Sequence, residues 1–289
     1  GMGGIGKTTI AKAVYNKIVD NFDGRCFLKN VKDHVGLVQV QELLLSRMLG
    51  KETLKLTSDD EGAEIIKVRL RQKKVLIVVD DVNDMNQLTQ LVGEPNWFGS
   101  GSRIIITTRD KRLLIRHKVN EIYEVGKLNY KDALELLCLN AFEAKRTLDQ
   151  DNMAIIDDVL HYSNGLPLAL VVIGSLLRIQ SRDIWQATLR SHRKSGKGID
   201  KFLKISYDAL DNDEKEFFLH IACFFKGKNK NCVMDILEGC DLNPDDGIEV
   251  LRKMALINIT GEDNIWMHGV LQDMGKNIVI QDSQIGLED

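Results

Sequence analysis

The chain has 289 residues and a formal net charge of -3, from 39 basic and 42 acidic side chains. This length allows two or three domains, and the near balance of charge gives no general attraction to nucleic acid or to a membrane surface. The longest apolar run, residues 165–177, is shorter than the roughly 20 residues that a bilayer-spanning helix needs. We therefore expect a buried core helix there and no membrane span.

The five cysteines are scattered along the chain, and none forms a C-x-x-C pair. Such spacing favours reduced thiols in a cytosolic protein, so we expect a cytoplasmic location, with the nucleus as an alternative. Cys232, Cys240 and the nearby His220 are a weak zinc candidate, because metal-binding pairs usually stand two to four residues apart.

Residues 1–127 alternate between predicted helices and strands. We expect helices at 7–20, 37–49 and 63–70, and strands at 25–31, 75–79 and 104–106, with a weaker last strand at 122–125. The five aliphatic residues at 75–79 indicate a strand that is buried on both faces. This alternation predicts an α/β nucleotide-binding domain with a parallel sheet. Because a phosphate-binding loop should follow a buried strand, we interpret the sequence as a fragment whose first strand is missing.

From Leu128 onward the pattern is helical. Asn129 is expected to cap a helix that ends near Phe142, with Asp132 as its capping-box partner. Further helices are expected at 152–162, 166–178 and 183–192, followed by a linker at 194–198. We predict a helical domain over residues 128–195.

Residues 196–289 form the third predicted domain. Asp211 and Glu214 make a capping signature ahead of a helix at 217–225. Helices near 233–237 and 247–254 precede two short strands, 256–260 and 264–267. Helices followed by a small hairpin are typical of a winged-helix domain.

The first nine residues fit the phosphate-binding loop pattern G-x-x-x-x-G-K-[ST]. Glycines let backbone N–H groups surround phosphate oxygens, and the following helix N-terminus adds positive charge. We expect Lys7 to reach the β-phosphate of ADP or ATP and the γ-phosphate when present, and the Thr8 hydroxyl to bind Mg²⁺. The alternative is a glycine-rich turn before a helix. The loop residues predicted to bind nucleotide are Gly1, Gly3, Gly4, Gly6, Lys7, Thr8 and Thr9.

Two acids follow the predicted strand at 75–79, and an arginine follows the strand at 104–106. Ligands of open α/β sheets bind at the carboxyl ends of the strands. Asp80 is therefore expected to hold Mg²⁺ through water, Asp81 to orient an attacking water, and Arg109 to contact a γ-phosphate. Taken alone, an acidic turn after a strand and a solvated surface arginine are the plainer explanations.

Five segments together resemble the NB-ARC domain of plant nucleotide-binding, leucine-rich-repeat immune receptors. They lie in the order found in that family, at residues 1–9, 76–82, 101–110, 165–170 and 267–268. Residues 26–31, 218–225 and 267–274 resemble segments of the TIR-carrying subclass. The resemblance covers nearly the whole chain, and the order of the segments makes it specific.

The resemblance implies a molecular switch that is off with ADP and on with ATP, and that forms a homo-oligomer when active. It implies that Pro167 packs near adenine and ribose and that His268 reaches the β-phosphate of ADP. TIR and leucine-rich-repeat domains would belong to the parent receptor. The usual Asp after Met-His is Gly269 here, so we expect this chain to lose a helix cap and part of the orientation of His268.

Two other functions remain open. A turnover ATPase is one, although the sequence offers no acceptor-substrate site. A winged-helix nucleic-acid-binding regulator is the other, but the third predicted domain begins with many acids where DNA binding needs a basic face.

Overall fold

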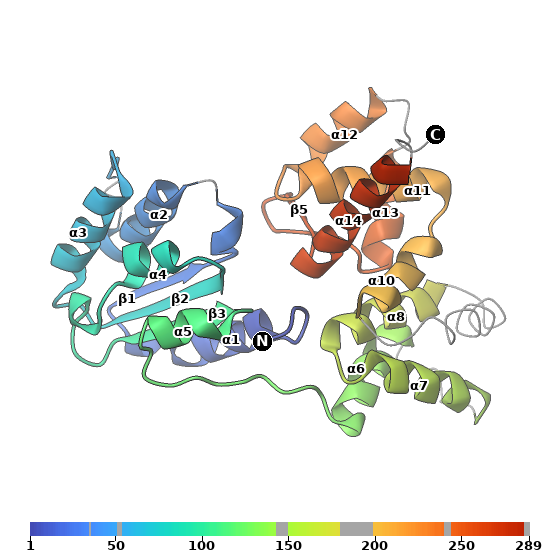
Figure 1. Cartoon of the computed structure of the whole chain (residues 1–289), viewed down its shortest axis with the longest axis horizontal. Coiled ribbons are helices and arrows are strands. Elements are labelled where there is room, and N and C mark those ends of the chain that lie inside the picture. The colour runs from blue at the N-terminus through green and yellow to red at the C-terminus, as the bar shows by residue number, and fades with distance from the viewer. Residues whose placement is uncertain (35, 51–53, 143–149, 180–198, 240–243, 286–289) are drawn as a thin grey trace. The chain divides into compact units, whose positions relative to one another are not determined.

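The computed structural model describes residues 1–34, 36–50, 54–142, 150–179, 199–239 and 244–285 (Figure 1). The chain divides into two compact units. The first contains residues 1–2 and 6–125, and the second contains residues 3–5 and 126–289. The finer division of the second unit at residue 195 stays a prediction.

The first unit is an α/β layer structure around three parallel strands in the order β1-β2-β3. The strands are β1 (Gly24–Leu28), β2 (Val75–Val82) and β3 (Arg103–Thr108). The α-helices are α1 (Lys7–Ile18), α2 (Leu37–Leu49), α3 (Asp59–Leu70), α4 (Met85–Val92) and α5 (Lys111–Arg116), and short helical turns are η1 (Val19–Asn21), η2 (Val31–Asp33) and η3 (Pro95–Trp97). The predicted parallel α/β arrangement is confirmed.

Alternate residues of the strands face two different helical layers. Ile77 and Val79 of β2 belong to the buried cluster that includes α2, α3, α4 and α5. Val78 between them packs with Phe27 of β1 and Ala11 of α1 on the other face. β2 lies between β1 and β3 in the described sheet, and it is buried on both faces, as its continuous aliphatic run predicts.

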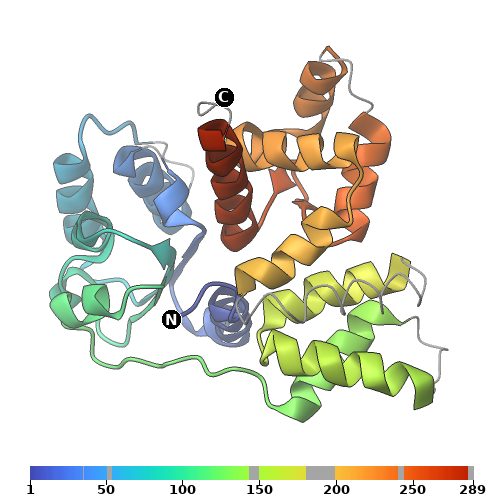
Figure 2. The ribbon, with the colours of Figure 1, turned by 45° about the vertical axis from the view of Figure 1, so that its right-hand side comes forward.

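Three packed helices follow at the start of the helical part of the second unit, and their colours run from green to yellow in Figure 2. They are α6 (Tyr130–Ala141), α7 (Gln150–Ser163) and α8 (Pro167–Ile179). Gly174 permits the close packing of α8 on α6, because a Cβ at this position would stand 2.8 Å from the Cβ of Asn140 and 3.1 Å from the carbonyl oxygen of Leu137. The apolar segment at 165–177 is thus a buried helix, as predicted.

The rest of the second unit has the helices and hairpin of a winged-helix domain. The helical elements are α10 (Ile199–Asp208), α11 (Asn212–His220), the π-helical turn η4 (Ile221–Phe225), α12 (Lys230–Glu238), α13 (Pro244–Lys253) and α14 (Gly269–Ile285). Strands β4 (Asn258–Ile259) and β5 (Ile265–Trp266) pair antiparallel. The capping box of Asp211 and Glu214 is confirmed: each side chain accepts the backbone N–H of the other residue.

Two expectations about local structure are wrong. Residues 122–125 are not a strand, because they pair with no neighbour in the described structure and Tyr123 is 79% exposed. Asn129 caps α6 through the N–H of Asp132, but the Asp132 carboxylate accepts from the Asn129 side-chain amide instead of its backbone N–H. The predicted helix at 183–192 and linker at 194–198 lie outside the described residues.

Candidate functional site

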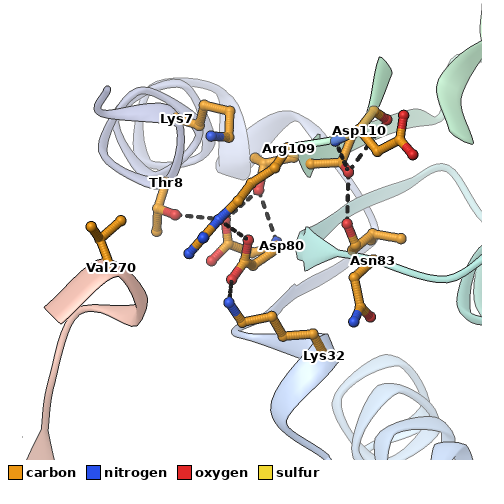
Figure 3. A network of polar contacts seen from close by, with 12 residues as sticks. Lys7, Thr8, Lys32, Asp80, Asn83, Arg109, Asp110 and Val270 are labelled. Atoms are coloured by element: carbon orange, nitrogen blue, oxygen red, sulfur yellow. Dashed lines mark hydrogen bonds and ion pairs between the residues drawn. The ribbon is translucent and has the colours of Figure 1, made fainter. Parts of the chain in front are cut away.

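The candidate site lies at the carboxyl edge of the parallel sheet in the first unit (Figure 3). Gly6 precedes α1 with φ 93°, a conformation that glycine adopts without steric cost. This turn at Gly6 lets α1 begin at Lys7, so that Lys7 and Thr8 are its first two residues. The Nζ of Lys7 donates to the carbonyl oxygens of Gly1 and Met2 at 3.0 and 2.8 Å. Burial lowers the pKa of Lys7 and the charge of Arg109 lowers it further, whereas Asp81 opposes both effects.

Asp80 joins the phosphate-binding loop to the central strand. Its Oδ1 accepts hydrogen bonds from the Thr8 hydroxyl at 2.8 Å and from the Thr107 hydroxyl at 2.6 Å. The residue is fully buried, and its Oδ2 has no hydrogen-bond partner among the described residues. A buried carboxylate oxygen without a partner carries a desolvation cost, and a hard cation such as Mg²⁺ prefers oxygen ligands of this kind. The residues present therefore fit a magnesium ion held by Thr8 and Asp80.

Asp81 forms ion pairs with two cationic side chains. Its Oδ2 is 2.7 Å from the Nζ of Lys32, and its Oδ1 is 3.8 Å from the Nε of Arg109. The Asp81 N–H donates to the hydroxyl of Thr107 at 2.9 Å. The structure thus brings together Lys7, Thr8, both acids and Arg109, which the sequence predicts at one sheet edge.

The remaining predicted residues are divided between the two units. Gly3, Gly4 and Ile5 belong to the second unit, in which the Gly4 carbonyl accepts the N–H of Leu168 at 3.2 Å. Pro167 is the first residue of α8, a position where a helix tolerates the missing N–H of proline. Thr9 lies exposed on α1 in the first unit, without a described polar contact.

His268 caps helix α14. Its Nδ1 accepts the N–H of Val270 at 3.1 Å, and its carbonyl accepts the N–H of Gln272 at 3.0 Å. These two bonds define the N-cap position. The expectation that Gly269 costs this helix its cap is therefore wrong, because His268 is the cap and Gly269 is already the first helical residue. With Nδ1 as an acceptor, a neutral imidazole carries its proton on Nε2, where it can donate.

The phosphate-binding loop, the acidic strand end and the arginine at the next strand end agree with a comparison to known families. The NB-ARC domain family matches residues 1–147, which is just over half of the chain. The chain belongs to the NB-ARC domain family. Membership supports nucleotide binding at the site described above.

The second half of this NB-ARC chain matches a winged-helix family. Residues 211–283 match the winged-helix domain described as Roq1-like, of disease resistance proteins. This range covers α11 to α14 and the β4–β5 hairpin, and it confirms the predicted winged helix. Within the described residues we find no helix with the length and apolar character that a bilayer crossing demands, and no cluster of three or more His, Cys, Asp or Glu side chains suited to a metal.

Curated relatives are similar over almost the whole NB-ARC chain. TMV resistance protein N of Nicotiana glutinosa is 40% identical over 96% of the chain, and the disease resistance proteins RPV1 and RUN1 of Vitis rotundifolia are each 42% identical over 96%. The chain spans 25%, 20% and 21% of these three relatives. Among solved structures, the Walker-type ATPase PABY2304 of Pyrococcus abyssi aligns with 96% of this chain and 89% of its own, at a TM-score of 0.43 and 14% identity.

Sequence reasoning missed two residues of the NB-ARC site. Lys32 lies in the turn η2 after β1 and contacts Asp81. Thr107 is the last but one residue of β3 and contacts both Asp80 and Asp81 near the end of β2. Thr107 lies in the segment that predicts Arg109, and the parallel order of β1 and β2 brings Lys32 to the same edge. For Thr107 the signal is its position near the end of a predicted strand, whereas no local pattern in the sequence points to Lys32.

Proposed function

We propose that this chain is the nucleotide-operated switch of a plant immune receptor, closed with ADP and open with ATP. The Thr8–Asp80 hydrogen bond carries the proposal, because it joins the phosphate-binding loop to the acidic strand end 72 residues away. Family membership supports nucleotide binding, and the similarity to disease resistance proteins supports a role in defence signalling. The parent receptor would contribute TIR and leucine-rich-repeat domains.

Different site residues would contact different parts of a bound triphosphate. Lys7 and the N-terminus of α1 attract the β- and γ-phosphates, and Arg109 compensates charge on the γ-phosphate. Thr8 and Asp80 would hold Mg²⁺, which when bound neutralises phosphate charge. By family resemblance, Pro167 packs against the adenosine and His268 donates from Nε2 to the β-phosphate of ADP.

Hydrolysis returns the switch to its closed state. Asp81 orients a water whose oxygen bonds to the γ-phosphorus while the bond from that phosphorus to the β,γ-bridging oxygen breaks. ADP leaves with the bridging oxygen, and the proton of the water passes through the Asp81 carboxylate to the released phosphate. We expect this step to be slow, as in unaided switch NTPases, at about 0.01 per second or less.

The test is the identity and lifetime of the bound nucleotide. The purified protein is denatured and the released nucleotide is separated by chromatography, and turnover is measured with labelled ATP. We expect close to one ADP per chain, slow turnover, and loss of the nucleotide in Lys7→Ala. The matched control Lys12→Ala, at an exposed position of the same helix, should keep ADP. ADP at full occupancy in Lys7→Ala overturns the site.

A turnover ATPase is distinguished by the same measurements. Its product would be released between cycles, so the purified protein would hold little ADP and turnover would exceed about 1 per second.

We also propose that the active form is a homo-oligomer. Light scattering with ADP and with a non-hydrolysable ATP analogue checks this, and an unchanged mass with the analogue contradicts it.

A further inference from the structure

The backbone at Asp81 departs from regular strand geometry. Pairing between β2 and β3 shifts register between Val79 and Val82, and Asp81 has φ 57°. In a regular strand, neighbouring residues point to opposite faces. A bulge re-aims a side chain. At this irregular end of β2, Asp80 accepts hydrogen bonds from hydroxyls, and Asp81 forms ion pairs with Lys32 and Arg109. The left-handed conformation is unfavourable for a non-glycine residue, and Asp81 keeps it where the ion pairs with Lys32 and Arg109 and the hydrogen bond to Thr107 hold the residue.

Lys32 is the nearer of the two cations that hold Asp81. Its Nζ lies 2.7 Å from Oδ2, against 3.8 Å from the Arg109 Nε to Oδ1. The side chains of Lys32 and Asp81 are 18% and 20% exposed, whereas that of Arg109 is 36% exposed. A partly buried pair at this distance is screened much less than a surface pair.

The segment that carries Lys32 is itself fixed. Val31 is 1% exposed within the core of the first unit. Asn30 adopts φ 49°, and its carbonyl accepts the N–H of Asp33 at 2.9 Å, which closes the turn η2. The ammonium of Lys32 therefore approaches Asp81 from an anchored turn and not from a free loop.

We infer that Lys32 is a positioning residue for the hydrolytic step: it restrains the Asp81 carboxylate so that Oδ1 faces the attacking water. This inference rests on the proposed function. Lys32 contacts Oδ2, and Oδ1 lies on the side of Arg109, the residue proposed to contact the γ-phosphate. Loss of Lys32 releases one of the two oxygens and lets the carboxylate turn, and a misplacement of about 1 Å at a reacting group costs up to about 100-fold in rate.

A double-mutant cycle in the purified protein tests this inference. The variants are Lys32→Met, Asp81→Asn and the double variant, with kcat for ATP hydrolysis and Kd for ADP measured for each. We expect Lys32→Met to lower kcat by about 10- to 100-fold and to leave Kd for ADP within twofold. In the Asp81→Asn background, Lys32→Met should change kcat no further, because residues that act as a unit are not additive.

Two further variants separate positioning from a general loss of charge or fold. Lys32→Arg keeps a cation near Asp81 and should recover most of kcat. Lys29→Met removes an exposed lysine from the same connection and should leave kcat unchanged.

The failures are distinguishable. If Asp81→Asn slows hydrolysis but Lys32→Met does not, the inference about Lys32 is overturned and the proposed function stands. The same holds if the two losses of kcat multiply in the double variant. A loss of ADP affinity in Lys32→Met equal to the loss of kcat also overturns it, because Lys32 then acts on binding or folding. If Asp81→Asn itself hydrolyses ATP at the normal rate, the proposed role of Asp81 fails and the inference with it.

Discussion

The hydroxyl of Thr8 serves two partners in the proposed mechanism. It donates to the buried carboxylate of Asp80, and it is the loop group expected to bind Mg²⁺. Thr8→Val keeps the shape of the side chain and removes the oxygen. We expect the affinity for MgATP to fall about tenfold or more and its dependence on Mg²⁺ to weaken, as measured by titration with and without EDTA.

The control for this variant is Thr89→Val on α4. Thr89 is exposed, and its hydroxyl donates to the Met85 carbonyl within the same helix. Its replacement should not change nucleotide affinity. Tight MgATP binding by Thr8→Val that still disappears with EDTA would contradict the assignment of Thr8 to the metal.

Gly269 is a second position where one residue is expected to alter the switch. An Asp at the first position of α14 interacts favourably with the helix dipole, by about 0.3–1 kcal/mol, and replaces a glycine of low helix propensity. His268 is already the N-cap. The expected gain is therefore a more stable first turn of α14, which holds His268 in place. We predict that Gly269→Asp slows ADP dissociation by up to about fivefold, which stopped-flow displacement of a fluorescent ADP measures. An off-rate equal to that of the natural sequence would show that the glycine is neutral.

At the scale of elements, the connection that leads into α8 depends on a glycine. Gly165 has φ 67°, and a Cβ there would stand 2.3 Å from the Leu128 carbonyl oxygen. The Gly165 carbonyl also accepts the N–H of Leu128 at 2.9 Å. Gly165→Ala must distort either the turn or the start of α6, so we predict a loss of about 2 kcal/mol or more in the free energy of unfolding.

Gly126→Ala is the matched control for that substitution. A Cβ at residue 126 meets no atom within 4 Å, so the change should alter stability by about 0.5 kcal/mol or less. Chemical denaturation of both variants gives the comparison. Equal stability of the two would mean that the backbone at residue 165 adapts without strain.

Elements with strong local signals could be predicted from the sequence. Helix α2 follows its apolar spacing, and β2 follows its continuous aliphatic run. The capping box at Asp211 is similarly local. The segment 122–125 could not be decided in this way, because a strand exists only where another strand pairs with it, and alternation of apolar and polar residues does not supply that partner.

The residues of the candidate site could also be predicted only where a local motif marks them. Lys7, Thr8 and Asp80 follow from motifs whose chemistry constrains their spacing. Lys32 carries no motif, and its contact with Asp81 depends on the parallel pairing of β1 with β2 and on the register shift in β2. Those features arise from long-range pairing, which the residues around Lys32 do not encode.

At the scale of the whole molecule, each unit has a buried core of its own. The core of the first unit is built on both faces of the sheet, with Leu44 and Ile77 among its fully buried residues. The core of the second unit runs from α6 to α14 and includes Phe217 and Phe218. Two separate cores are expected to unfold as two cooperative units unless something couples them.

The proposed switch supplies that coupling through the nucleotide. A ligand that binds only the folded protein stabilises it by RT ln(1 + [L]/Kd), about 2.7 kcal/mol at a free concentration 100 times Kd. If residues of both units hold ADP, the stabilisation is lost when either unit unfolds. We therefore predict two calorimetric transitions without nucleotide and one shared transition at higher temperature with saturating ADP.

His268→Ala tests whether the second unit takes part in this coupling. We expect this variant to bind ADP through the first unit and to keep two transitions at saturating ADP, with only that of the first unit raised. The control His161→Ala alters an exposed histidine of α7 and should merge its transitions as the natural sequence does. A single ADP-dependent transition in His268→Ala would contradict the role of His268, because the second unit would then gain its stabilisation without the imidazole.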